Sequence, residues 1–191
     1  MQGRNTPTHP QVPPDAPVTL DGFDVLDTCH RQTVFTLGKL AALVARLRSL
    51  GPDDEARALA AQIVDHFTTT ARQHHADEEQ HVFPKLLAAG DPKLVQAVLS
   101  LQQDHFWLEV DWTELSPQLE AVAAGRTCPD LDALHEAVEI FATLSRAHIA
   151  LEEAWIYPEA RSRLQDRERH EMAREMANRR RSQRTHPAGA D

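Results

Sequence analysis

Two stretches of the chain carry the same residues at the same spacing. They are His74-x-x-x-Glu78-Glu79-x-x-Val82-Phe83-Pro84 and His148-x-x-x-Glu152-Glu153-x-x-Ile156-Tyr157-Pro158. A further histidine precedes each stretch, His30 by 44 residues and His105 by 43. Residues four apart share one face of a helix, so each stretch places a histidine beside a carboxylate. The repeat predicts two copies of one helical hairpin, related by a pseudo-twofold axis, with a symmetric site between them.

Glycine and proline divide the chain into long helical segments. The breaks are at Gly51-Pro52, at Gly90-Asp91-Pro92 and between Gly125 and Asp130, and they leave segments of roughly 22–50, 53–89, 92–124 and 130–162. Each segment carries apolar residues at spacings of three and four, which is typical of amphipathic helices. Strand-like alternation is absent from the sequence, which excludes a β-sandwich or barrel. We therefore predict an all-α protein with an up-down-up-down four-helix bundle.

The two ends of the chain differ in composition from the centre. Five of the 12 prolines lie in the first 17 residues, so residues 1–20 are predicted to be a disordered tail. Residues 21–162 are predicted to form the bundle. Residues 163–191 are predicted to form a charged, helical or disordered tail, whose arginines we expect at a solvated helix end rather than on an acidic partner.

Charge and cysteine content limit which cellular compartment and which classes of partner we expect for this protein. The formal net charge of −9 argues against a general nucleic-acid binder. No apolar run reaches the roughly 18 residues of a membrane span, and the first residues lack the hydrophobic region of a secretory signal. Two cysteines cannot form a disulfide framework. We expect a cytoplasmic protein with no nucleic-acid partner and no membrane contact.

Every apolar stripe is interrupted by a histidine where a core residue is expected. Because a helix rises about 1.5 Å per residue, all four of these histidines come to about the same level of the bundle, with two carboxylates one turn away. The set is His30, His74, His105 and His148, with Glu78 and Glu152. Imidazole and carboxylate ligands suit iron, zinc or manganese. Four neutral histidines and two bridging glutamates fit two divalent cations, and an additional oxo or hydroxo bridge leaves each cation one open position for a small ligand.

Simpler explanations exist for some of these pairs. Histidine and glutamate four residues apart also form ordinary ion pairs on exposed helices. We assign His135 and Glu139 to the surface for this reason, whereas His75 and Glu79, about 100° from the stripe, form an alternative register. Four histidines satisfied by hydrogen bonds within the core are the alternative to a metal site as a whole.

The order and spacing of these residues resemble those of the hemerythrin-like (HHE cation-binding) domain over about residues 22–162, most clearly in the segments HADEEQHVFP and HIALEEAWIYP. The resemblance implies a four-helix bundle with a non-haem centre of two iron ions, bridged by oxo or hydroxo and by carboxylates. It also implies that His30, His74, His105 and His148 are terminal ligands, and that Glu78 and Glu152 are the bridges.

One position departs from the oxygen-carrying members of that family. They have a fifth histidine four residues after the third, where this chain has Glu109. The arrangement is more similar to bacterial members implicated in the repair of iron centres and in nitric-oxide stress. Glu109 is therefore a candidate additional ligand, and the alternative is an acid that does not touch the metal.

The resemblance implies binding of O₂, NO or peroxide for sensing, handling or scavenging. The main alternative is a di-iron enzyme of oxidative or nitrosative stress, which degrades peroxide or NO or repairs iron centres. A zinc-stabilised scaffold without redox chemistry is a third hypothesis. Stable, reversible adducts favour the binding protein, and oxidation in air followed by turnover favours the enzyme.

Overall fold

The computed structural model describes residues 20–127 and 130–185, without the side chains of 183–185. Across these residues every regular element is a helix and no strand is present, which confirms the all-helical prediction. The predicted disordered segment 1–20 lies outside the described residues apart from residue 20, and so does the end of the chain from residue 186. No described helix has the length and apolarity needed to cross a membrane.

The four predicted segments appear as long helical units, two of them interrupted by π-helical turns. The elements are α1 (Gly22–Leu50); α2 (Asp54–Asp65), η1 (His66–Ala71), α3 (Arg72–His81) and α4 (Phe83–Ala88); α5 (Pro92–Ala123); α6 (Leu131–Leu151), η2 (Glu152–Ile156) and α7 (Tyr157–Arg163); and α8 (Asp166–Thr185). Pro84 and Pro158, at equivalent places in the repeat, each lie in the first turn of a short helix, where proline is tolerated.

The helix ends follow from local chemistry. An aspartate caps the start of α1, α2, α5 and α6, and its side chain accepts a hydrogen bond from the backbone of the first turn. Gly51, Gly90 and Gly125 follow the helical units with φ angles of 75°, 69° and 77°. Residues with a Cβ atom rarely adopt that conformation, so glycine fixes where each helical unit ends.

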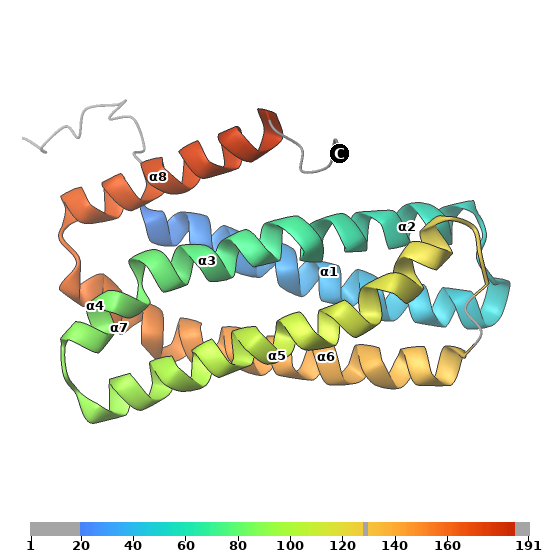
Figure 1. Ribbon diagram of the computed structural model, residues 1–191, viewed down its shortest axis with the longest axis horizontal. Helices are drawn as coiled ribbons and strands as arrows, with labels where there is room; N and C mark the ends of the chain where they lie inside the picture. The colour runs from blue at the N-terminus through green and yellow to red at the C-terminus, as the bar shows by residue number, and fades with distance from the viewer. Residues whose placement is uncertain (1–19, 128–129, 186–191) are drawn as a thin grey trace, which may run out of the picture.

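The long helices lie side by side around a common interior (Figure 1). α1 packs against α2 and α6, and α5 packs against the same two helices on the opposite side. Short connections join successive helical units at alternating ends of the molecule (Figure 1). All of the long helices therefore direct one face inward.

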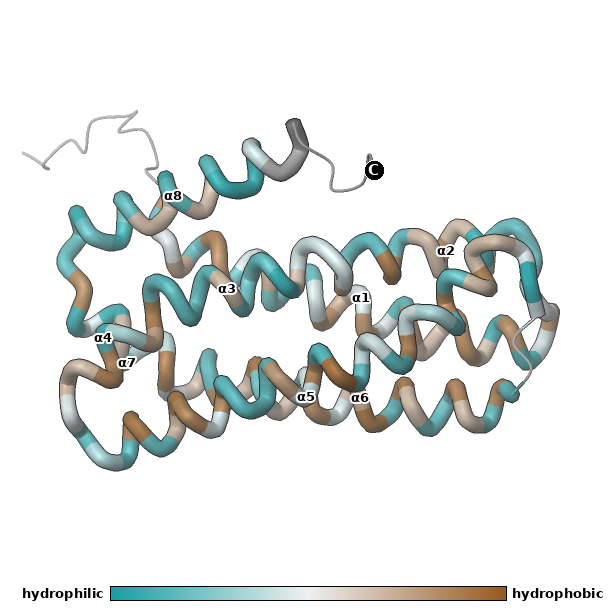
Figure 2. Tube along the Cα trace, viewed as in Figure 1, coloured by the Kyte–Doolittle hydropathy of each residue, from teal (hydrophilic) through white to brown (hydrophobic). Residues whose placement is uncertain are grey.

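The apolar interior is divided into two clusters with a polar layer between them. The first cluster contains Leu37, Ile63, Leu115 and Val138, and the second contains Phe23, Leu26, Phe83, Leu101 and Ile156. Figure 2 shows hydrophobic residues recurring along the long helices. On each helical unit the buried histidine comes between the residues of one cluster and those of the other. The packing thus holds the histidines in a single layer, closed by apolar side chains on both sides.

The C-terminal helix α8 packs onto this framework, which differs from the solvated end that we expected. Met172 and Met176 belong to the second apolar cluster, and Met176 has no exposed surface. Arg179 and Arg180 both pair with Asp77, whose side chain is only 1% exposed, at 2.5 and 2.8 Å. The close approach is also visible at Gly22, where an added Cβ would lie 2.5 Å from Met172 Cγ. Met172 and Met176, four residues apart, form a short apolar face on α8. The many charged residues around them made this face hard to recognise in the sequence.

This packing predicts that α8 contributes to the stability of the whole fold. Met176→Ala removes a fully buried side chain, so we expect it to lower the free energy of unfolding by about 2–4 kcal/mol. Leu99→Ala is the matched control, because Leu99 is 50% exposed on α5, and we expect a change within about 0.5 kcal/mol. Urea denaturation of both variants measures the difference, and equal effects would contradict the docking of α8.

Candidate metal centre

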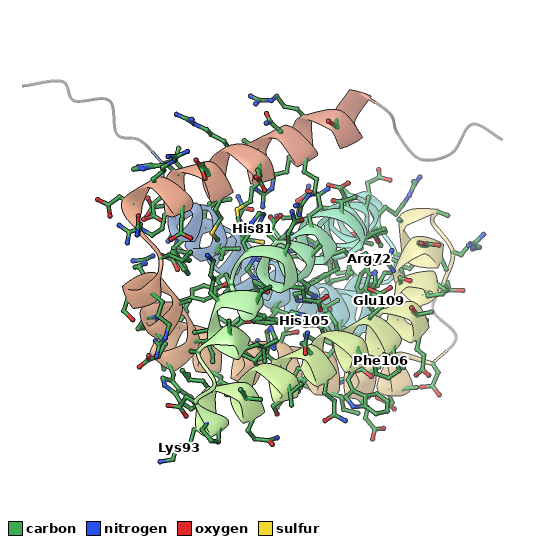
Figure 3. All side chains as sticks on the ribbon, turned by 60° about the vertical axis from the view of Figure 1, so that its left-hand side comes forward. Arg72, His81, Lys93, His105, Phe106 and Glu109 are labelled. Carbon is green, nitrogen blue, oxygen red and sulfur yellow. The ribbon has the colours of Figure 1, made fainter. Side chains whose placement is uncertain are left out.

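Six buried polar side chains meet in the layer between the two apolar clusters. α1, α5 and α6 each supply one histidine, α3 supplies a histidine and a glutamate, and η2 supplies the second glutamate. The six are His30, His105, His148, His74, Glu78 and Glu152. The four histidines are at most 6% exposed, and the two glutamates have no exposed surface. Figure 3 shows His105 among the side chains between the helices.

The six side chains form two groups of four that share both glutamates. One group adds His30 and His74 to Glu78 and Glu152, and the other adds His105 and His148. Within each group one ligand atom per residue lies within 4.8 Å of the others. The two groups correspond to the two copies of the sequence repeat, because each group contains the lone histidine and the HxxxE histidine of one hairpin.

Each glutamate directs one oxygen to each group. Oε1 of Glu78 lies 3.3 Å from His74 Nε2, and its Oε2 lies 3.4 Å from His105 Nε2. Glu152 does the same with the other pair, since Oε2 lies 3.1 Å from His30 Nε2 and Oε1 lies 3.2 Å from His148 Nε2. A carboxylate whose two oxygens face two different ligand sets has the arrangement of a bridging ligand.

Several of these atoms are buried without a hydrogen-bond partner. In the described part of the chain they include Nε2 of His74, His105 and His148, Oε2 of Glu78 and both carboxylate oxygens of Glu152. Such burial is costly for polar groups, and more so for charged ones. Two ligands bound at about 2.1 Å to one ion lie about 3 Å apart when they are at right angles, which is close to the observed separations. The residues therefore fit two cations, one in each group.

Carboxylates outside the six contact the second ring nitrogen of two histidines and approach that of a third. Glu79 Oε1 lies 2.9 Å from His105 Nδ1, and Glu153 Oε1 lies 3.1 Å from His30 Nδ1. Asp104 Oδ2 faces His148 Nδ1 at 3.6 Å. Such contacts fix the orientation of a ligating ring and raise its basicity.

Glu79 and Glu153 occupy equivalent positions in the repeat, and each contacts the lone histidine of the opposite hairpin. Neither glutamate was predicted from the sequence to contact a histidine of the other hairpin. The second glutamate of the pair in each repeat was the sequence feature that could have indicated this contact.

The two halves of the centre differ at one position of the repeat. The Tyr157 hydroxyl donates a hydrogen bond to Glu78 Oε1 at 2.5 Å and lies 3.1 Å from His30 Nε2. Its counterpart Phe83 has no hydroxyl and stacks on His105, with ring centroids 5.5 Å apart. Tyr157 is buried, and it brings a proton donor to one half of the centre.

Three further polar side chains belong to neither group of four. Glu109 is in neither group, and its Oε2 accepts a hydrogen bond of 2.9 Å from Arg72 Nε. His81 is 3.7 Å from Glu175 of α8. His75, predicted about 100° from the apolar stripe, nevertheless stacks on His105 with ring centroids 4.1 Å apart, and it forms a third group with His105 and His148.

Burial lowers the pKa of the buried histidines, and the nearby carboxylates raise it. Burial lowers the pKa of His74 to about 3, because nearby Glu78 offsets only part of the desolvation. Burial also disfavours the charged form of His148, but Glu152 and Asp104 outweigh it and raise the pKa of His148 to about 10. Glu152 is desolvated as well, yet His148 and His30 lower its pKa to about 2. The metal-free protein thus holds a protonated histidine beside an ionised carboxylate.

A cation must displace that proton, because a ligating histidine is neutral. His148 has a pKa of about 10, so cation affinity should increase with pH across the neutral range, because the small deprotonated fraction that can bind the cation grows as the pH rises toward that pKa. We expect titration calorimetry with Zn²⁺ at neutral pH, in two buffers of different ionisation enthalpy, to show release of at least about one proton per chain. Binding without proton release would contradict this assignment.

Comparison with known proteins agrees with the geometry. A protein of Haemophilus influenzae, described as an uncharacterized protein, is 30% identical over 131 residues, which cover 69% of this chain and 74% of that protein. Residues 21–160 match the hemerythrin HHE cation binding domain, and this range includes all six side chains of the centre. The family match and the clustered histidines and glutamates together indicate a protein that binds metal cations. The chain therefore belongs to the hemerythrin HHE cation binding domain family.

Proposed function

We propose that the chain holds two iron ions, bridged by Glu78, Glu152 and an oxo or hydroxo group, within an up-down-up-down bundle of the hemerythrin type. The protein binds O₂, NO or peroxide there, for sensing, handling or scavenging. The observation that carries the proposal is that each buried glutamate faces both histidine pairs, at 3.1–3.4 Å. Two separate ion sites would not need this sharing.

The protein residues determine what the centre can do. The iron pair, when bound, supplies electrons and open coordination positions for a small ligand. Glu78 and Glu152 neutralise part of the cation charge, and Glu79 and Glu153 hold two of the histidine rings in place. Cys29, whose Sγ lies 3.9 Å from the backbone oxygen of Thr70, belongs to none of the ligand groups in the described chain. An all-nitrogen and oxygen ligand set suits iron, and a cavity beside the histidines leaves room for the small molecule.

An enzyme of peroxide or NO degradation is the second candidate, and Tyr157 favours it. Its hydroxyl is within hydrogen-bond distance of both Glu78 and His30. A buried donor in this position can deliver a proton to a ligand during bond cleavage, which a reversible binding protein does not require.

Metal loading and optical spectra test the main proposal. We expect about two iron ions per chain, and visible absorption that appears when the anaerobically reduced protein meets air. Bands that vanish under argon indicate reversible binding, and bands that persist indicate oxidation and favour the enzyme. Metal-loaded protein that shows no such bands would contradict the di-iron proposal and favour the zinc scaffold.

Substitution of one ligand sharpens this test. His148→Ala should lower the iron content and abolish the absorption, because His148 is buried within 3.2 Å of Glu152. His135→Ala is the matched control, since His135 also precedes a glutamate by four residues but is exposed on α6. Equal iron content in both variants would contradict the assignment of His148.

Tyr157→Phe separates the two candidate functions. The substitution removes one hydroxyl and keeps the buried ring. If the protein is an enzyme, we expect slower peroxide consumption, by about 10²–10⁴-fold for a lost proton donor, with the iron content retained. Unchanged consumption would contradict a role for Tyr157 in proton delivery.

A further inference from the structure

A small cavity adjoins the histidines on the side of the first apolar cluster. Its volume is about 30 Å³, and its walls include Phe67, Leu108, Trp112, Phe141 and Ile149. His30, His74 and His148 form the wall toward the metal centre. That volume suffices for a water-sized or diatomic molecule and is far below the several hundred Å³ of pockets for organic ligands.

Two charged residues lie where this cavity meets solvent. Arg72 and Glu109 are the exposed members of the described cavity wall, each with 47% of its side chain accessible, while His75 is partly buried and the other wall residues are buried. Arg72 comes from α3 and Glu109 from α5, so their pairing spans two helices (Figure 3). The guanidinium donates from Nε and from a terminal nitrogen to the two carboxylate oxygens of Glu109.

We infer that the Arg72–Glu109 pair forms the entrance to the metal centre and selects small molecules by charge. The opposite charges cancel at the opening, and the walls behind them are mostly apolar, so a neutral diatomic molecule passes without losing strong hydration. An anion must leave water for an apolar space and finds no net attraction at the entrance. This inference rests on the proposed function for the identity of the ligand, and it gives Glu109 a role at the entrance in place of one as a ligand.

The charge of the entrance can be altered one residue at a time. Glu109→Gln leaves Arg72 unpaired and should speed binding of azide, an anionic probe, to the iron-loaded protein. Arg72→Gln leaves Glu109 unpaired and should slow it. We expect changes of about two- to fivefold in opposite directions at low salt, comparable with the energy of one exposed ion pair. Rates for NO, a neutral probe, should change much less.

Lys85 and Glu168 supply matched controls. They form an ion pair between α4 and α8 with side chains 47% and 36% exposed, and neither lines the cavity. Lys85→Gln and Glu168→Gln alter the net charge as the entrance variants do, so they should leave the azide rate near that of the unsubstituted protein. Stopped-flow absorbance measures all of these rates. Equal effects of control and entrance variants, or azide rates that move in one direction, would overturn the inference.

A metal-independent measurement separates this inference from the proposed function. Trp112 lines the cavity and is 3% exposed, so its fluorescence reports access when Trp107 and Trp155 are replaced by phenylalanine. Without added metal, iodide quenching should increase in Glu109→Gln and decrease in Arg72→Gln, with the Lys85 and Glu168 variants unchanged. This result in a protein that takes up no iron would uphold the entrance and reject the di-iron proposal. Normal iron loading with unchanged quenching and azide rates would do the reverse.

Discussion

Two carboxylates, Glu78 and Glu152, lie at the centre of the protein with no exposed surface. An ionised group in such a position pays a large desolvation cost unless opposite charge lies nearby. Among the described residues, the ion-pair partners of both glutamates are histidines. A protonated histidine offsets part of this charge, and the two cations that we propose would offset all of it. The apolar clusters on both sides limit contact with water, which lowers the local dielectric and would strengthen the attraction between the glutamates and a cation.

The same residues also join the two hairpins of the repeat. Glu79 contacts His105 and Glu153 contacts His30, so each hairpin orients a histidine of the other. Separating the hairpins would break both contacts. It would also move Glu78 away from His105 and Glu152 away from His30, so metal binding at this site would be coupled to folding. One of the two π-helical turns begins at Glu152 and the other contributes Phe67 to the cavity wall, consistent with the frequent occurrence of such turns at functional sites.

Much of this arrangement could be predicted from periodicity and spacing, and the exceptions have physical causes. The glycine and proline breaks coincide with helix ends, and the six residues at stripe positions come together. Spacing within one helix cannot specify contacts between helices, so it did not predict that His105 would stack on His75 or that Arg72 would pair with Glu109. The strong charge of α8 likewise concealed Met172 and Met176, which pack into the core. The difference between Tyr157 and Phe83 was visible in the repeat, but its consequence depends on the position of Glu78.

We propose that two cations share Glu78 and Glu152. Crystals of the iron-loaded protein, measured at the iron absorption edge, test it directly through anomalous scattering. We predict two peaks about 3–4 Å apart, one beside His30 and His74 and the other beside His105 and His148, with both glutamates between them. A single peak, or a peak bound by His75, His105 and His148 without the glutamates, would contradict the account.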